Sequence, residues 1–368
     1  MLARAVCVPL AVLLVGSACS ASDSERSRPV TVGFIFVGAR DDLGYNQAAW
    51  EGSEALARAF PDLRVIRVEH VPEDERAVAV LEDLIDEGAS ILFATSFGHR
   101  DAAYEVAQHH PDVTVLHEGG LELEPDLPNF GTYFGTHSEA LFLAGMAAGA
   151  ATRTGKLGFV VAFPIPATFN NVNAFTLGAQ ALAPEVTTEV VFTGDWCNPA
   201  EQSAAAAHLI SAGVDVIAQH QDCTRTILES AESAGIYSVG YHADGSEVAP
   251  EGWLIGAVWV WDEVLIDVVG TILDGRFEGS VYEGDFRGSM AGGDNPFVLT
   301  EPGPAVTPET RAHLEEERKA LESGASPFSG PLVDRDGTVR VPAGTALDSR
   351  GVESMDWFVA GVIGDIPG

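Results

Sequence analysis

The chain has 368 residues, 46% of them hydrophobic, and carries a formal net charge of −34 at pH 7. This length is too great for one ordinary domain and is ample for two hydrophobic cores. A surface this acidic repels phosphate backbones and anionic lipid headgroups, which argues against a nucleic-acid partner and against docking on a lipid surface.

The N-terminal stretch is typical of a secretory signal. Arg4 supplies an early positive charge, and the apolar run over 5–15 is too short to span a bilayer. Small residues then lead into Cys19, so we expect 1–19 to be a signal peptide with a lipoprotein cysteine; ordinary cleavage is the alternative. The small and charged stretch 20–29 is typical of a disordered tether. We therefore expect an exported protein, held by its lipid on the outer face of the cell membrane or free in the periplasm.

Strands and helices alternate from residue 32 onward. Apolar, β-branched runs predict strands, and apolar residues at helical spacing predict helices, such as Leu81, Leu84 and Ile85 in the helix over 72–87. The strands expected in this first array are 32–37, 63–69, 91–95, 113–117 and 129–134. Its helices are expected over 45–60, 72–87, 102–109 and 139–151.

The same pattern restarts after residue 155. The second array is expected to contain strands over 156–162, 186–193, 214–218, 236–239 and 254–259. Its helices are expected over 168–182, 199–211, 224–234 and 263–273. Strands that alternate with helices imply parallel sheets. We therefore predict an α/β fold of two lobes around a cleft, each lobe a parallel sheet flanked by helices. Residues 30–137 plus 262–306 would form the first lobe and 138–261 the second.

The C-terminal part has a different pattern. Thr307 caps a charged helix over 308–323, and the pair Asp336-Gly337 is typical of a β-hairpin turn. An apolar segment over 355–362, helical or extended, closes the chain. We expect residues 307–368 to be an extension that packs on the lobes.

Two cysteines fall in the folded part, Cys197 and Cys223. Each follows a predicted strand at a comparable place in successive units, so their loops are expected to be neighbours. In an exported protein they could form a disulfide; two buried thiols are the alternative. A zinc site would need more ligands nearby, and we expect no metal.

Polar and aromatic side chains collect at the predicted carboxyl ends of the strands, where open α/β sheets bind ligands. From the first lobe they include Asp42, Tyr45, Asn46, Phe97 and Asp101. From the second lobe they include Phe169, Asn170, Trp196, Asp222, Tyr241 and Asp244. Aromatics on both sides of a cleft can hold a flat ring, while carboxylates and amides bind its N–H groups. The sequence thus predicts a site for a polar, ring-bearing ligand.

Signatures of catalysis are scarce. The chain has no GxSxG, no HExxH and no Gly-rich phosphate loop. The tripeptides His220-Gln221-Asp222 and His242-Ala243-Asp244 could serve a metal or acid–base chemistry, but His-x-Asp is common by chance. We interpret these histidines as neutral hydrogen-bonding groups of the cleft and expect no enzyme activity and no cofactor.

Several motifs in order resemble the basic membrane protein family of substrate-binding lipoproteins. They are LGYNQAAWEG over 43–52, TSFGHRD over 95–101, DVIAQHQD over 215–222 and VGYHADGS over 239–246. The resemblance implies a two-lobed, periplasmic-binding-protein type I fold. It also implies delivery of a purine nucleoside, or a related compound, to an ABC importer.

The resemblance assigns roles to residues of the first lobe. Tyr45 corresponds to the aromatic residue that stacks on the base, with Asn46 beside it, and Asp42 falls near the group that reads the base. The second loop of the cleft corresponds to Phe97, Gly98 and Asp101.

In the second lobe, the resemblance implies that Phe169 and Asn170 form a wall of the cleft and that Asp244 holds ribose hydroxyls. Nucleoside-binding members carry a lysine on the last strand of this lobe, about where this chain has Trp259. A tryptophan cannot donate a charged hydrogen bond to a sugar, so this difference favours a free purine base. Hinge packing of Trp259 and Trp261 is the alternative.

We therefore expect a monomeric substrate-binding lipoprotein that closes on a purine nucleobase or nucleoside and presents it to an ABC permease. A ligand-sensing domain for a membrane receptor would need the same closure and is one alternative. The others are an exported enzyme that acts on nucleosides and a binder of a different small molecule, such as a sugar.

Overall fold

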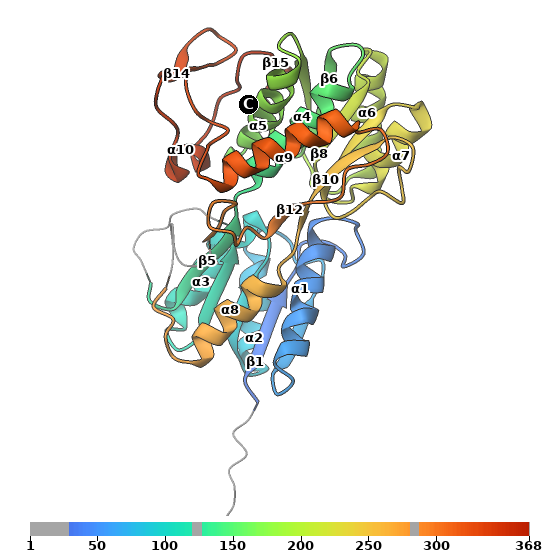
Figure 1. Cartoon of the computed structure of the whole chain (residues 1–368). Helices are drawn as coiled ribbons and strands as arrows, with labels where there is room; N and C mark the ends of the chain where they lie inside the picture. The colour runs from blue at the N-terminus through green and yellow to red at the C-terminus, as the bar shows by residue number, and fades with distance from the viewer. Residues whose placement is uncertain (1–28, 120–126, 280–286, 368) are drawn as a thin grey trace, which may run out of the picture.

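The computed structural model describes residues 29–119, 127–279 and 287–367 (Figure 1). The predicted signal peptide, its Cys19 and nearly all of the tether lie outside the described residues. Within the described residues, no helix has both the length and the apolar character needed to cross a membrane.

The first lobe is built on a parallel six-stranded sheet with the order β11-β5-β4-β3-β1-β2. Its strands are β1 (Thr31–Ile35), β2 (Arg64–Val68), β3 (Ala89–Ala94), β4 (Thr114–Glu118), β5 (Phe130–Gly135) and β11 (Arg287–Gly288). The helices of this lobe are α1 (Tyr45–Ala59), α2 (Arg76–Asp86), α3 (Arg100–His109) and α8 (Asp262–Leu273). The central strands β1 and β3 are buried except at Ser90, because most of their side chains on both faces are apolar.

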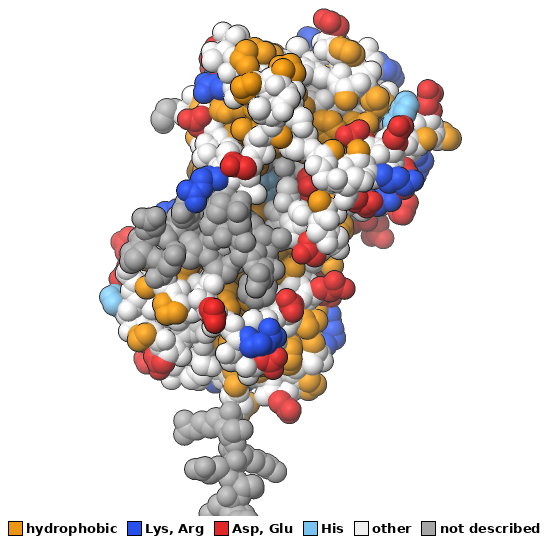
Figure 2. Space-filling view, turned by 60° about the vertical axis from the view of Figure 1, so that its left-hand side comes forward, with side chains coloured by type: hydrophobic (Ala, Val, Ile, Leu, Met, Phe, Trp, Pro, Cys, Tyr) orange, Lys and Arg blue, Asp and Glu red, His pale blue; other side chains and the backbone are white. Residues whose placement is uncertain are grey.

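The second lobe has a seven-stranded sheet with the order β12-β10-β9-β8-β6-β7-β15, in which β12 alone is antiparallel to its neighbour. Its strands are β6 (Lys156–Val161), β7 (Thr187–Phe192), β8 (Val216–His220), β9 (Tyr237–His242), β10 (Trp253–Trp259), β12 (Phe297–Leu299) and β15 (Val362–Ile363). Its helices are α4 (His137–Ala151), α5 (Pro166–Leu182), α6 (Pro199–Ser211) and α7 (Arg225–Ala234). On the face of the molecule in Figure 2, acidic side chains are spread over both lobes rather than gathered in one patch.

The chain returns to the first lobe for a shorter stretch than the predicted 262–306. Helix α8 lies beside α1, and β11 extends the first sheet (Figure 1). Strand β12 then pairs with β10, and Phe297 packs on Trp259 with ring centroids 4.4 Å apart. Residues 297–299 therefore belong to the second sheet, because they pair with the edge strand β10 and bury Phe297 against Trp259.

The C-terminal extension packs on the second lobe. It contains α9 (Pro308–Glu322), a hairpin of β13 (Leu332–Val333) and β14 (Val339–Val341), and α10 (Ser349–Glu353). Thr307 caps α9 by accepting from the Thr310 N–H at 3.1 Å, as its position predicts. The segment over 355–362 is not helical: Val359 forms an isolated bridge with Asp334, and Val362 begins β15, which pairs with β7 at the edge of the sheet.

Helices α4 and α5 approach each other closely enough for their backbones to touch. A Cβ atom on Gly178 would overlap the carbonyl oxygen of Phe142, and one on Gly145 would overlap that of Phe175. Glycine is therefore required at these positions for lack of space. Both helices begin at the cleft between the lobes. The distance between them therefore sets how far apart their first residues lie in the cleft.

Candidate functional site

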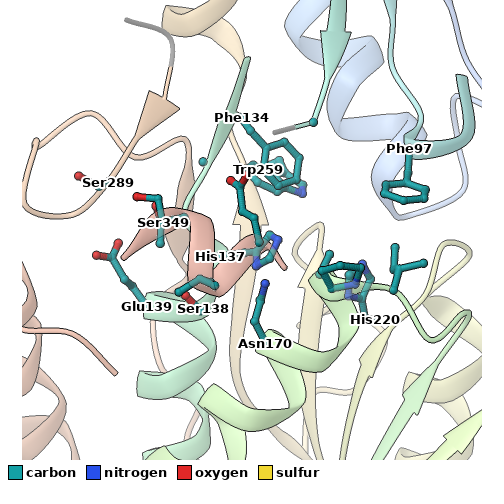
Figure 3. A pocket seen from close by; sticks show the side chains of 18 of the residues that line it. Phe97, Phe134, His137, Ser138, Glu139, Asn170, His220, Trp259, Ser289 and Ser349 are labelled. Carbon is teal, nitrogen blue, oxygen red and sulfur yellow. The ribbon is translucent and has the colours of Figure 1, made fainter. Parts of the chain in front are cut away.

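A cavity of about 290 Å³ lies between the lobes, at the carboxyl ends of strands from both sheets (Figure 3). Side chains that follow β4, β5, β8, β9 and β10 line it, together with the first residues of α1, α4 and α5. This is the location at which open α/β sheets bind ligands.

Among the described residues, seven phenylalanine, tyrosine and tryptophan side chains line the cavity. They are Tyr45, Phe97, Phe134, Trp196, Tyr241, Trp259 and Phe328. Trp259 stacks on the buried Trp261 with centroids 4.4 Å apart and an interplanar angle of 12°. Trp259 therefore both packs at the hinge and exposes an edge or face to the cavity.

Two buried carboxylates face the cavity from opposite lobes. Glu118 ends β4, accepts from the Tyr133 hydroxyl at 3.0 Å, and also interacts with Tyr45. Burial raises the pKa of the Glu118 carboxyl to about 8. Asp222 follows β8, and its pKa is raised well above its usual range by burial and then by the charge of Asp42. Within the described residues, the lining contains no Lys or Arg, so neither carboxylate has a cationic partner in the cavity.

The two histidines of the His-x-Asp tripeptides are neutral. Burial lowers the pKa of His220 and His242 well below the usual range, and their mutual proximity adds to this for His242. Trp259 Nε1 donates to His242 Nδ1 at 3.0 Å, which leaves the imidazole proton on Nε2, 3.8 Å from Asp222 Oδ1. Among the described residues, no group of three or more potential ligands is arranged to hold a metal ion.

Asp42 and Asn46 do not line the cavity. Asp42 accepts from the backbone N–H groups of Gly44 and Gln47 at 2.8 and 3.0 Å, so it fixes the start of α1. Asn46 donates to Asp42 at 2.8 Å and, across the cleft, to Asp222 at 3.1 Å. The two residues therefore position Tyr45 and Asp222 from behind, whereas the sequence predicted direct contact with ligand.

Asp101 and Asp244 also lie away from the cavity. Both are exposed. Asp101 pairs with the adjacent Arg100 at 2.8 Å, and Asp244 accepts from the Ser246 N–H at 2.9 Å in a local turn. A carboxylate that directly follows a strand can turn back to its own backbone, which is what happens at Asp244.

Phe169 and Gly98 have structural roles in place of the predicted ligand contacts. Phe169 lies in the core, with its ring 4.8 Å from that of Phe358 in the C-terminal extension. The Gly98 N–H donates to Glu73 Oε1 at 2.8 Å, and a Cβ at Gly98 would meet the Glu73 side chain at 2.6 Å. The neighbours Asn170 and Phe97, by contrast, do line the cavity.

Glu118 and Phe134 line the site but were missed from the sequence. The sequence predicts that the strand before Glu118 ends at 117, which places Glu118 in a loop. It predicts Phe134 to be the last residue of a strand. Both stand at carboxyl ends of strands, which is the signal that could have found them.

The Cys197 and Cys223 sulfurs are bonded, with Cα atoms 5.3 Å apart. Trp196 precedes the first cysteine and Asp222 precedes the second, so the disulfide ties together two loops that line the cavity. Trp196 Nε1 also donates to Glu73 Oε2 of the first lobe at 3.1 Å. The loops are thus fixed to each other and joined to the opposite lobe.

A family model described as ABC transporter substrate-binding protein PnrA-like matches residues 29–283. The chain belongs to this family of substrate-binding proteins. The family resemblance inferred from the motifs is therefore confirmed. Members work outside the cytoplasm, each with a small-molecule ligand and an ABC permease as partners.

Relatives and a solved structure extend this finding. The chain is 28% identical to a purine-binding protein of Brucella abortus, over 98% of this chain and 99% of the relative. It is 31% identical to a protein of Haloferax volcanii that is provisionally named an ABC transporter glucose-binding protein, over 93% and 83%. A solute-binding protein of an ABC transporter system from Conexibacter woesei superposes with a TM-score of 0.63 at 20% identity, over 80% and 97%, which confirms the predicted fold.

Proposed function

We propose that the protein binds a purine nucleobase or nucleoside in the interlobe cavity and presents it to an ABC permease. One observation carries the proposal: Glu118 and Asp222 enter the same aromatic cavity from opposite lobes, without a lysine or arginine in its described lining. Such a site suits a flat, uncharged ligand that carries N–H donors on two sides. It disfavours phosphorylated or carboxylated ligands, because the described lining has no lysine or arginine to pair with their negative charge.

The aromatic side chains and the polar side chains of the cavity have different roles in binding. Tyr45 and Trp259 offer ring faces or edges, and stacking of a base on an aromatic ring contributes about 1–3 kcal/mol. Glu118 and Asp222 accept hydrogen bonds from the ligand. The buried Asn170 lines the cavity with an Oδ1 that has no protein partner, so this oxygen accepts a further one.

Closure of the lobes completes the site. The hydrogen bonds from Asn46 to Asp222 and from Trp196 to Glu73 both join one lobe to the other. They form only when the cleft is shut, so a ligand that draws Asp222 and Glu118 together also favours these bonds. Lobe closure would then be the state that the permease recognises.

Titration calorimetry with adenine, adenosine and glucose tests the ligand class, on the chain without its signal peptide and with its disulfide intact. We expect heat of binding from a purine and none from glucose. Glucose is included because aromatic platforms also bind pyranose faces and a relative carries that name. Binding of glucose alone would replace the purine proposal by a sugar-binding one.

The raised pKa of Glu118 gives this binding a pH dependence. A ligand N–H donates more strongly to an ionised carboxylate than to a protonated one, and with a pKa of about 8 the Glu118 carboxyl is mostly protonated at pH 7. We expect affinity for adenosine to rise from pH 7 to pH 9 as the proton is lost, at most about tenfold. Glu118→Gln cannot ionise and should remove this rise. An affinity that falls over this range would show that the protonated Glu118 carboxyl donates a hydrogen bond to the ligand instead.

The mature protein is proposed to be a monomer anchored by a lipid on Cys19, binding without turnover. Mass spectrometry of the protein from a membrane fraction tests the anchor, because a diacylated cysteine adds mass that ordinary cleavage does not. Recovery of unaltered adenosine after incubation is the result expected of a binding protein, and a changed product would indicate an enzyme.

A further inference from the structure

The cavity has two ends of different chemistry. At one end are Phe97 and His220, and at the other Ser138, Glu139, Ser289 and Ser349 gather around a polar space (Figure 3). The aromatic end accounts for the ring of the ligand proposed above. The polar end has no role in that binding.

The wall of this polar end comes from the C-terminal extension, which lies beyond the region matched by the family model. Phe328 lines the cavity from the loop after α9, and Ser349, Val352 and Glu353 line it from α10. Leu347 N–H donates to the Phe328 carbonyl at 3.2 Å, so the two lining segments are joined to each other.

The wall is firmly attached to the second lobe. The Asn173 side chain of α5 donates to the Trp357 carbonyl at 2.8 Å and accepts from the Val359 N–H at 2.9 Å. Phe358 packs on Phe169 of the same helix, and Met355 is buried. The extension therefore moves with the second lobe and forms part of the site whenever the cleft closes.

The side of the polar end opposite the extension is formed by the first residues of α4, which hydrogen bonds hold in place. Ser138 and Glu139 are buried at the start of α4. The Glu139 carboxylate accepts from the Met290 N–H at 2.9 Å and from Asn295 at 3.3 Å, which holds it beside the cavity. Serine hydroxyls donate to and accept from sugar hydroxyls, and carboxylates accept from them. Among the described residues the lining has no cation for a phosphate.

We propose that the C-terminal extension builds a second compartment of the cavity, which binds a hydroxyl-bearing substituent on the purine ring. This inference rests on the proposed purine function. The sequence assigns the binding of hydroxyl groups to Asp244, but Asp244 is exposed outside the cavity. We assign it instead to the compartment lined by Ser349 and Glu353. The extension then sets the specificity of the site.

Two substitutions test the compartment by calorimetry with adenosine and adenine. Ser349→Trp fills the polar space, so we expect adenosine affinity to fall at least tenfold and adenine affinity to change less than twofold. Ser323→Trp, at an exposed position after α9 and outside the cavity, should change neither affinity. Glu353→Gln keeps the volume and removes the charge; we expect a several-fold loss for adenosine alone, with Glu316→Gln on the exposed side of α9 as control.

The outcomes separate this inference from the proposed function. If the unmodified protein binds neither purine, the proposed function fails and the inference falls with it. If it binds adenine more tightly than adenosine, or if Ser349→Trp leaves adenosine affinity intact or lowers both affinities equally, the compartment is refuted while purine binding stands.

Discussion

Tyr45→Ala is expected to weaken adenosine binding between about tenfold and a hundredfold, within the range for loss of one base-stacking ring. Tyr45 stands at the first residue of α1, half-buried, with its ring 5.0 Å from that of His242. Asp42 and Asn46 hold this helix start in place, so the ring is positioned before the ligand arrives. Preorganised aromatic contact area contributes more to affinity than a mobile side chain, because less conformational entropy is lost on binding.

Calorimetry at fixed pH measures the loss of affinity in Tyr45→Ala. Tyr45→Phe separates the contribution of the ring from that of the hydroxyl. The phenylalanine keeps the ring and loses the hydroxyl beside Glu118. We expect it to bind adenosine within about threefold of the unmodified protein, because a neutral hydrogen bond adds only about 0.5–1.5 kcal/mol. Unchanged affinity of Tyr45→Ala, with an unaltered unfolding midpoint, would reduce Tyr45 to a packing residue.

The fold was largely predictable because its strands are short, apolar and regularly spaced. The predicted strands of each lobe agree with observed ones to within a few residues, whereas the short edge strands β11, β12 and β15 were not predicted. Helix α2 begins at Arg76 instead of residue 72, since Glu73 turns away to bind Ser96 and Gly98. This cross-chain contact has no local sequence signal.

The sequence predicted which loops line the site, but not which residue of each loop faces the cavity. Tyr45, Asn170, Trp196, Asp222, Tyr241 and Trp259 all line the cavity, as expected of polar and aromatic residues at strand ends. The sequence does not show which of two adjacent residues faces the cavity. Asn170 lines the cavity, whereas the adjacent Phe169 is buried in the core. Rotation about a helix start cannot be resolved from composition.

The extension could not be placed from the sequence. Helix α10 has five residues, too few for a periodic pattern, and it was not predicted. Its position depends on the side-chain amide of Asn173, which binds the backbone of Trp357 and Val359 after α10, 184 and 186 residues further along the chain. Long-range contacts of this kind leave no trace in the spacing of nearby residues.

Gly178→Ala is expected to lower the free energy of unfolding by about 3 kcal/mol, at the upper end of the cost of overpacking a core. Its new methyl group would overlap the Phe142 carbonyl oxygen and lie 2.8 Å from the carbonyl carbon and 3.1 Å from Met146 N. These are backbone atoms of α4, so no side-chain rotation can relieve the clash and the helices must separate. Urea denaturation followed by circular dichroism measures the loss.

Gly270→Ala is the matched control, since Gly270 also lies inside a helix but has only Phe60 Cζ, at 3.9 Å, near a new Cβ. Alanine there should stabilise the protein by up to about 1 kcal/mol through helix propensity. Similar unfolding midpoints for the two variants would contradict the close packing of α4 on α5. Because these helices carry Glu139 and Asn170 at their cleft ends, their separation should also weaken adenosine binding. The small residues of two buried helices thus set the spacing on which the ligand site depends.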